Sequence, residues 1–290
     1  MAGKSAMVHP YKGHTVALAT KHQKEEVLGP IFQSSLGLKI FVPPNLDTDL
    51  LGTFSGEIQR IGTPHEVAIK KARWGMRVSS LSLGLASEGS FGPDPRLMFV
   101  PSDHELLAFV DDNLGIEVIE QVIDLETNYG SQSAKTLDDL ADFLVRAKFP
   151  SHGLIVEPNS GFQVGYLFKG ITDPADLHKA IAACAAVSHD GLARVQTDMR
   201  AHMNPSRRAV LRQVAQKLVL RLATLCPQCA TPGWGMVDSV KGLPCEWCHS
   251  ETSLTRQEVY GCVKCDYRDV TPRNDGLQFA PASLCPSCNP

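Results

Sequence analysis

Eight of the nine cysteines lie in four Cys-x-x-Cys pairs within the last 65 residues of this 290-residue chain. Each pair can turn two thiolates toward one tetrahedral ion, so four pairs supply two complete four-cysteine zinc sites. Because protein ligands fill every position of such sites, they are structural rather than catalytic. We therefore predict a C-terminal double zinc-ribbon, folded largely by two Zn²⁺ ions. The pairs are Cys226/Cys229, Cys245/Cys248, Cys262/Cys265 and Cys285/Cys288.

A disulfide framework is the competing interpretation of these cysteines, and it requires an oxidising compartment. Met1 is followed by polar and basic residues, with no apolar segment before His14 that would act as a signal peptide. We therefore favour zinc and expect a cytoplasmic protein. The longest apolar run, near Ala180–Val187, is far too short to span a membrane, so no membrane partner is expected.

The pairing of the cysteines is not determined by the spacing alone. Thirteen residues separate Cys248 from Cys262, which is typical of two knuckles on adjacent hairpins. This spacing favours a nested arrangement, in which the second and third pairs share one ion and the first and fourth pairs share the other. An interleaved arrangement, first with third and second with fourth, stays open.

The charge of the zinc module bears on its partner. Residues 222–290 contain five Lys/Arg and seven Asp/Glu, and two four-thiolate zinc centres bring the formal charge to about −6. Proteins that bind a phosphate backbone do so mainly through clustered Lys/Arg. The acidic balance therefore speaks against nucleic acid and favours a structural role or a contact with a protein partner.

The preceding residues predict an α/β domain, a mixed sheet with flanking helices over residues 1–222, followed by the zinc module over 223–290. Thr63-Pro64-His65-Glu66 is a capping box that begins a helix, and Asp173-Pro174 and Asn204-Pro205 begin two others. No G-x-G-x-x-G, P-loop, H-E-x-x-H or G-x-S-x-G motif is present. The expected strands are Thr15–Ala19, Leu38–Val42, Leu81–Ala86, Leu97–Val100, Leu106–Val110, Ile116–Ile123, Leu154–Val156, Val164–Phe168 and Ala193–Gln196.

One polar cluster, Thr197–Arg208, leaves a strand and ends at a helix N-terminus, where backbone N–H groups and the helix dipole attract anions. Arg200, His202 and Arg207 are therefore candidates for binding a phosphate. The alternative is a solvated basic turn in which Asp198 and Arg200 simply pair.

Two further clusters contain carboxylates beside glycines. Asp47 and Asp49, followed by Gly52–Glu57, suit a hard cation such as Mg²⁺, and a polar turn is the alternative. Glu88 ends a strongly apolar run, at the position where open α/β sheets place ligand-binding groups. A plain β-turn accounts for Gly89 and Gly92 but not for Glu88.

Several segments carry a resemblance to known families. GTFSGE with Arg60, ASEGSFGP and TDMRAHMNP, followed by CPQC and LPCEWC, resemble a bacterial family of unknown function. More distantly, Thr20 with Lys24, Thr53-Phe54, Ala68-x-x-Lys71-Ala72 and Glu88-Gly89 resemble the inosine triphosphate pyrophosphatase type of fold. Those enzymes hydrolyse nucleoside triphosphates with Mg²⁺. The resemblance implies that Lys24, Lys71 and Arg200 hold phosphates, and that Glu57 and Glu88 hold metal or activate water.

The leading hypothesis is an Mg²⁺-dependent hydrolase acting on a phosphorylated, nucleotide-like small molecule. A non-catalytic nucleotide sensor or adaptor, which uses the zinc module for protein contacts, is the alternative from another class. A nucleic-acid-modifying enzyme is the third, and the acidic balance of the module counts against it.

Overall fold

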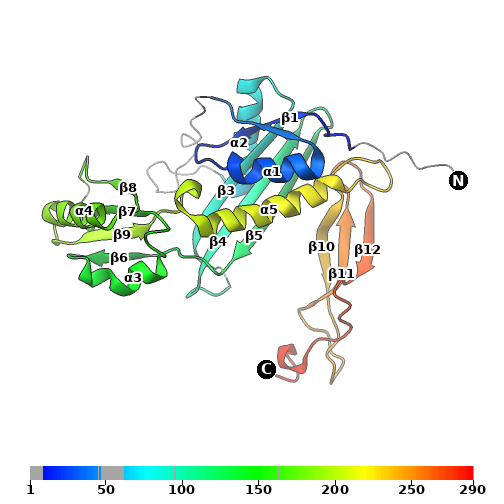
Figure 1. Ribbon diagram of the computed structural model, residues 1–290. Helices are drawn as coiled ribbons and strands as arrows, with labels where there is room; N and C mark the ends of the chain where they lie inside the picture. The colour runs from blue at the N-terminus through cyan, green and yellow to red at the C-terminus, as the bar shows by residue number, and fades with distance from the viewer. Residues whose placement is uncertain (1–8, 45, 47–61, 95, 162, 290) are drawn as a thin grey trace. The chain divides into compact units, whose positions relative to one another are not determined.

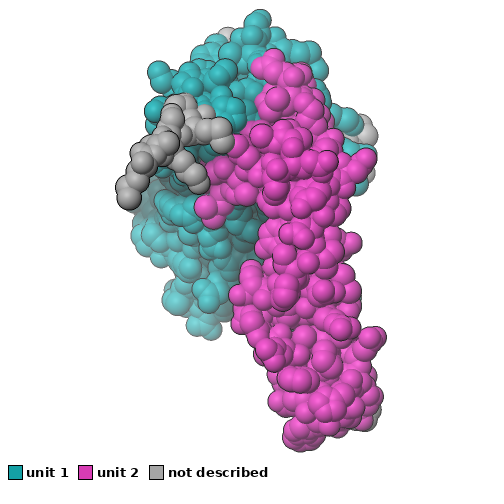
Figure 2. All heavy atoms as spheres, turned by 90° about the vertical axis from the view of Figure 1, so that its right-hand side faces the viewer, with its two compact units in different colours: residues 1–110, 119–218 teal, residues 111–118, 219–290 magenta. Residues whose placement is uncertain are grey.

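The computed structural model describes residues 9–44, 46, 62–94, 96–161 and 163–289. The chain divides into two compact units, residues 1–110 with 119–218 and residues 111–118 with 219–290 (Figure 2). The predicted fold class, α/β with a mixed sheet and flanking helices plus a small cysteine-rich module, is confirmed. The division into domains 1–222 and 223–290 stays a prediction.

A five-stranded mixed sheet has the order β2-β1-β3-β4-β5 (Figure 1). β1 pairs in parallel with β2 and with β3, and its last partner on β3 is Ala86. β3 continues to Pro93, so its polar second half extends beyond the carboxyl end of β1. The strands are β1 (Thr15–Ala19), β2 (Lys39–Phe41), β3 (Leu83–Pro93), β4 (Pro101–Asp111) and β5 (Ile116–Asp124).

Helices cover both faces of this sheet. Met76 of α2 (Pro64–Ser79) packs with Ala86 and Val110 on one face. α1 (Glu25–Leu36) packs through Val27 against Leu211 of α5 (Pro205–Ala223), and both helices lie in front of the sheet in Figure 1. Because side chains alternate along a strand, the even-numbered residues of β3 and β4 face α2 and the odd-numbered residues face α1 and α5.

The predicted capping box at the start of α2 is confirmed. Thr63 Oγ1 accepts the Glu66 N–H at 3.3 Å, and Glu66 Oε2 accepts the Thr63 N–H at 2.8 Å. The side chain of Asp173 likewise accepts two N–H groups at the start of α4 (Pro174–Val187). Both helices begin where local side-chain chemistry satisfies the exposed backbone donors.

A second, antiparallel sheet has the order β6-β9-β7-β8 and lies in the first unit. Leu154 and Val156 of β7 pack in one core with Phe143 and Ile181 of the adjacent helices. The elements are β6 (Ser131–Ala134), α3 (Ala141–Arg146), β7 (Leu154–Pro158), β8 (Phe168–Ile171), α4 and β9 (Ala193–Thr197).

Two of the predicted strands were wrong. Leu97–Val100 lies in a turn, because Asp94 Oδ1 accepts the N–H groups of Arg96 and Leu97, and Phe99 is exposed. Val164 is also exposed, and the strand expected there begins only at Phe168. In both cases an apolar run marks solvent-facing residues beside a turn rather than a buried strand.

The second unit contains a three-stranded antiparallel sheet with the order β10-β11-β12. Its strands are β10 (Gly235–Lys241), β11 (Thr255–Gly261) and β12 (Arg268–Pro272). Within the part of the chain that the structure describes, no helix is both long enough and apolar enough to cross a membrane.

Candidate functional site

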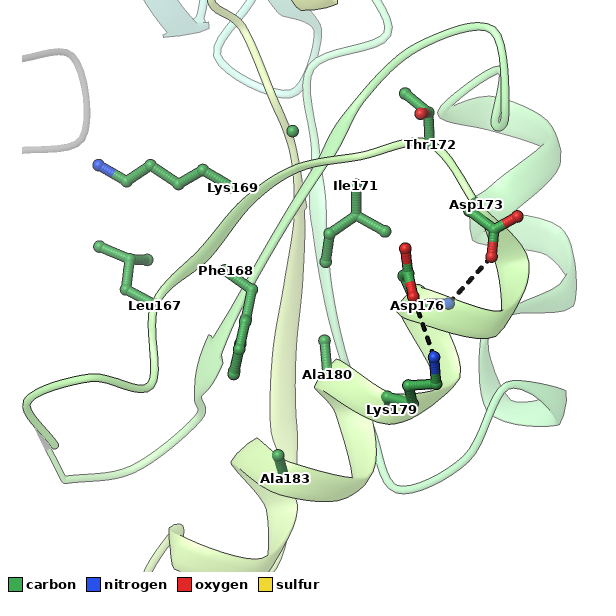
Figure 3. A pocket seen from close by; sticks show the side chains of 11 residues that line it. Leu167, Phe168, Lys169, Ile171, Thr172, Asp173, Asp176, Lys179, Ala180 and Ala183 are labelled. Carbon is green, nitrogen blue, oxygen red and sulfur yellow. Dashed lines mark hydrogen bonds and ion pairs between the residues drawn. The ribbon is translucent and has the colours of Figure 1, made fainter.

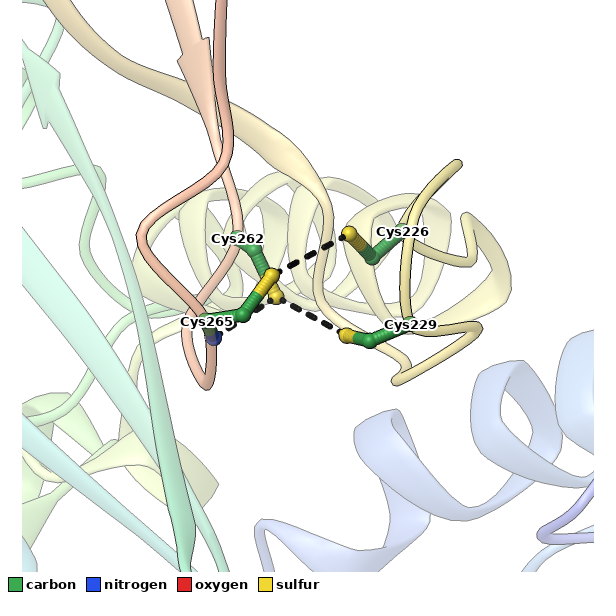
Figure 4. A group of neighbouring side chains, drawn as sticks. All are labelled: Cys226, Cys229, Cys262 and Cys265. Atoms are coloured by element: carbon green, nitrogen blue, oxygen red, sulfur yellow. Dashed lines mark hydrogen bonds between the residues drawn. The ribbon is translucent and has the colours of Figure 1, made fainter.

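Two groups of four cysteines lie in the second unit, and the sulfur atoms of each group are within 4.8 Å of one another. Neighbouring sulfur atoms are 3.6 and 3.8 Å apart in one group and 3.6 and 3.9 Å apart in the other. A tetrahedral ion with Zn–S bonds of about 2.3 Å requires sulfur atoms about 3.8 Å apart. The two groups therefore suit two zinc ions. They are Cys226, Cys229, Cys262 and Cys265 (Figure 4), and Cys245, Cys248, Cys285 and Cys288.

The favoured nested pairing is wrong, and the interleaved alternative is the observed one. The first pair precedes β10 and the third pair follows β11, so both lie at one end of the sheet. The second pair follows β10 and the fourth pair follows β12, so both lie at the other end. Successive connections of an antiparallel meander alternate between its two ends, so neighbouring pairs are kept apart. The seven residues of β11 alone span about 24 Å. The short gap from Cys248 to Cys262 was misleading because a whole strand fills half of it.

In each group, a loop hydroxyl favours the thiolate form of one cysteine. The hydroxyl of Thr231 lowers the pKa of Cys229 to about 6, and the hydroxyl of Ser250 does the same for Cys248. The Trp247 N–H donates to Cys245 Sγ at 3.4 Å. Because zinc binds thiolates, these contacts favour zinc binding by Cys229, Cys245 and Cys248.

A second candidate site is a buried group of charged side chains at the carboxyl end of β1. Electrostatic coupling links its members: Lys24 interacts with Arg207, Glu105, Glu88 and Lys71, and Asp103 interacts with Glu105, Arg207 and Lys24. Every member is less than one tenth exposed. We refer to Lys24, Lys71, Glu88, Asp103, Glu105 and Arg207 as the charged cluster. Lys24, Lys71, Glu88 and Arg207 were candidate residues from the sequence, and the fold brings them together; their roles stay predictions.

Lys24 precedes α1 and points into the cluster. Its Nζ donates to Ser87 Oγ at 2.7 Å, just beyond the last β3 residue that pairs with β1. Burial, followed by the nearby Arg207 guanidinium, lowers the pKa of Lys24 to about 8. The ammonium group therefore loses its proton far more readily than an exposed lysine does.

Lys71 and Glu88 form a buried ion pair, with Lys71 Nζ 2.5 Å from Glu88 Oε1. The even-numbered Glu88 faces α2, and the helix that the capping box begins places Lys71 opposite it. An ion pair this deeply buried gives up hydration on both sides and is retained only where its geometry is good.

Arg207, in the first turn of α5, reaches the opposite face of β3. Its Nε donates to Glu105 Oε1 at 2.5 Å, Nη1 donates to the Met199 carbonyl, and the guanidinium lies 5.0 Å from the centre of the Phe91 ring. Gly89 leaves the space for this arrangement, because a Cβ there would lie 2.7 Å from Glu105 Oε1. Phosphate binding by Arg207 stays a prediction, and the protein supplies Glu105 as its counterion.

Sequence reasoning missed Asp103 and Glu105. Both lie on β4, two residues apart and on the same face, and they are 1% and 0% exposed. Burial, followed by the neighbouring Glu105 carboxylate, raises the pKa of Asp103 to about 8. The available signal was the Asp-x-Glu pattern immediately before the apolar run Leu106–Val110. Its alternation continues the predicted strand toward the N-terminus and places both carboxyl groups on one face.

The segment after β9 carries the other candidate phosphate ligands. Arg200 donates through Nε to both oxygens of Asp198, so the pair left open by the sequence is present. The His202 ring lies 5.3 Å from the His22 ring, and burial followed by Arg200 lowers the pKa of His202. Asn204 Oδ1 accepts the Arg207 N–H at 2.9 Å. Phosphate binding by Arg200 and His202 stays a prediction.

The remaining candidates from the sequence are Asp47, Asp49 and Glu57, which lie outside the described residues. Their predicted roles in binding Mg²⁺ or activating water stay predictions.

A separate pocket of about 720 Å³ lies along β8 and α4 (Figure 3). Phe168 and Ala180 form part of its wall, and Lys179 pairs with Asp176 at 3.2 Å on its rim. None of the described candidate residues lines this pocket.

Comparison with protein families gives one finding. A family described as a domain of unknown function (DUF6671) matches residues 71–290, which is more than half of the chain. The matched region contains Lys71, Glu88, Asp103, Glu105, Arg207 and both four-cysteine groups. A comparison with curated proteins finds no match.

Proposed function

This chain belongs to the family described as a domain of unknown function (DUF6671), and we propose that it is an Mg²⁺-dependent hydrolase of a nucleotide-like, phosphorylated small molecule. The observation that carries the proposal is the charged cluster. Three cationic side chains, Lys24, Lys71 and Arg207, are buried together where β3 passes the end of β1. Ligands of open α/β sheets bind outside the carboxyl ends of the strands, which is where these cations lie.

Lys24 and Lys71 would hold the phosphate oxygens, with Arg200 as a more exposed third cation. Both lysines are already oriented by protein contacts, Lys24 by Ser87 and Lys71 by Glu88. Cations fixed in a buried site stabilise negative charge that grows on a phosphoryl group without having to rearrange during the reaction.

Glu88 would accept a proton from the attacking water or contribute to metal binding. Its carboxylate is buried beside Lys71. A phosphate held by Lys71 would therefore lie next to the base. When bound, Mg²⁺ supplies a Lewis acid that polarises a phosphoryl oxygen. Asp47, Asp49 and Glu57 are the carboxylates that the sequence offers for it.

The test is release of phosphate and pyrophosphate from a panel of nucleoside mono-, di- and triphosphates with Mg²⁺ or Mn²⁺. Wild type is compared with Glu88→Gln, and the matched control is Glu126→Gln, an exposed residue outside the cluster. We expect turnover in wild type and in the control, and a loss of about 100-fold or more in Glu88→Gln, the range for a general base. Equal turnover in all three proteins removes Glu88 from the mechanism.

A non-catalytic sensor or adaptor is the second candidate, and the zinc module favours it. Trp247, between the cysteines of the second pair, is 73% exposed, and Phe279 and Leu284 nearby in the same module are also exposed. Exposed apolar side chains of this kind suit a protein partner. Thermal stabilisation by one member of the nucleotide panel, without any turnover, would favour this second function over the first.

A further inference from the structure

Asp103 is a buried acidic residue of the first unit with an unsatisfied oxygen. It is 1% exposed, and its Oδ1 has no hydrogen-bond partner among the described residues. Removing a carboxyl group from water without giving it a hydrogen-bond partner is destabilising, so such groups are rare unless they bind something.

Glu105 has the same property on the same face of β4. Its Oε1 accepts from Arg207, while Oε2 has no partner among the described residues although the side chain is fully buried. Residues two apart on a strand point in the same direction, so the two unpartnered oxygens belong to one side of the sheet. Asp103 is electrostatically coupled to Glu105 more strongly than to any other charged group.

Oxygen atoms of one or two carboxylates, completed by water and substrate phosphates, are the ligands that Mg²⁺ takes in proteins. We propose that Asp103 and Glu105 of β4 bind a divalent cation of the Mg²⁺/Mn²⁺ class through these two oxygens. The substrate of this site rests on the proposed function, but binding of the ion does not depend on it. It supplies metal ligands from residues that the structure describes.

The charges around this site indicate that the ion binds together with a phosphate-bearing ligand. The charged cluster contains three cations and three carboxyl groups, which balance only when Asp103, whose pKa is raised to about 8, has lost its proton to bind the ion. A divalent ion adds two positive charges close to Lys24 and Arg207. A phosphate-bearing ligand cancels them, so the metal and the phosphate bind more tightly together than separately.

The test measures Mn²⁺ binding to the full-length, zinc-loaded protein by loss of the electron paramagnetic resonance signal of the free ion. Pyrophosphate is the phosphate probe. We expect wild type to bind one Mn²⁺ per chain, more tightly with pyrophosphate than without. Asp103→Asn should weaken Mn²⁺ binding at least about tenfold. No binding by wild type in either condition overturns the site.

Two comparisons keep the result independent of folding. The matched control is Asp111→Asn, because Asp111 is a buried carboxylate on the same strand whose Oδ1 already accepts from Asn113 and Leu114. It should bind Mn²⁺ like wild type. Metal-free Asp103→Asn should melt near the temperature of metal-free wild type, since the amide is uncharged and close in size to the buried carboxyl group that it replaces. Unchanged Mn²⁺ affinity in Asp103→Asn means that Asp103 is simply a protonated core residue, and it overturns the proposal.

The outcome is separable from that of the hydrolase proposal. Mn²⁺ binding that depends on Asp103, without turnover of any nucleotide, sustains the site and removes the hydrolase. Nucleotide turnover by wild type, together with normal Mn²⁺ binding by Asp103→Asn, sustains the hydrolase and removes the site.

Discussion

The guanidinium of Arg207 occupies the space that a side chain at Gly89 would need. Arg207 comes from the first turn of α5 and Gly89 from the part of β3 that continues past β1. The missing Cβ therefore lets a helix residue lie against the sheet and reach Glu105 on the next strand. A glycine that the sequence offered only as a turn residue is in fact a condition for a buried ion pair.

Gly89→Ala should destabilise the protein by about 2–4 kcal/mol, because the methyl group displaces Arg207 and weakens its pair with Glu105. Urea unfolding measures the change. Gly92→Ala on the same strand is the control, since its Cβ would enter open space, and it should shift stability by about 0.5 kcal/mol or less. Similar losses in both variants would show that the close contact has no energetic weight.

Zinc content tests the interleaved pairing. Cys226→Ser/Cys262→Ser removes two ligands of one group, so the variant should retain one of two zinc ions per chain. Cys226→Ser/Cys285→Ser removes one ligand from each group and should lose both, or bind both weakly. Plasma emission spectroscopy after dialysis against a mild chelator gives the count. Nested pairing predicts the opposite order for these two variants.

The stability of the protein should depend on pH through Lys24. Its pKa is about 8 in the folded protein against 10.5 for an unperturbed lysine, so between these values the unfolded chain binds a proton that the folded chain does not. Stability attributable to Lys24 therefore rises from pH 8 to 10.5, and below pH 8 the buried ammonium is a cost. Arg207, Glu105, Glu88 and Lys71 face this group.

Lys24→Met removes that titration. The free energy of unfolding of wild type minus that of Lys24→Met should increase across the same window, measured by urea unfolding at several pH values. A difference that stays constant with pH would mean that Lys24 keeps an ordinary pKa.

Arg200→Ala should weaken binding of pyrophosphate about tenfold and lower stability by about 1–3 kcal/mol, because the fully buried Asp198 carboxylate loses its cation. Isothermal titration calorimetry measures the affinity. Arg194→Ala on β9 is the control, since Arg194 is half exposed and its ion pair with Glu157 is long, at 3.9 Å. Unchanged affinity in Arg200→Ala would remove it from the phosphate site.

Local chemistry made part of this fold predictable. The starts of α2 and α4 follow from Thr63 and Asp173, whose side chains satisfy the first N–H groups of each helix. The presence of two four-cysteine sites follows from the spacing within the four Cys-x-x-Cys pairs, although the grouping of the pairs does not. These features depend on residues a few positions apart, which a sequence shows directly.

Features that depend on strand order were not predictable. Asp103 and Glu105 gain their meaning only when β4 lies beside β3 and opposite Arg207, a residue more than 100 positions away. The cysteine pairing depends on which ends of the β10–β12 meander carry each knuckle. β6 was missed because its four residues, Ser131–Ala134, are mostly polar.

The interleaved cysteine groups also impose an order of assembly during synthesis. The first metal site is complete only once Cys265, which follows β11, has been synthesised, and the second only once Cys288 has been. The loop that the first site closes contains Cys245 and Cys248 of the second site, and the loop that the second site closes contains Cys262 and Cys265 of the first. A nascent chain that stops after β12 therefore contains the complete first metal site but only half of the second, because Cys245 and Cys248 lack their fellow ligands Cys285 and Cys288.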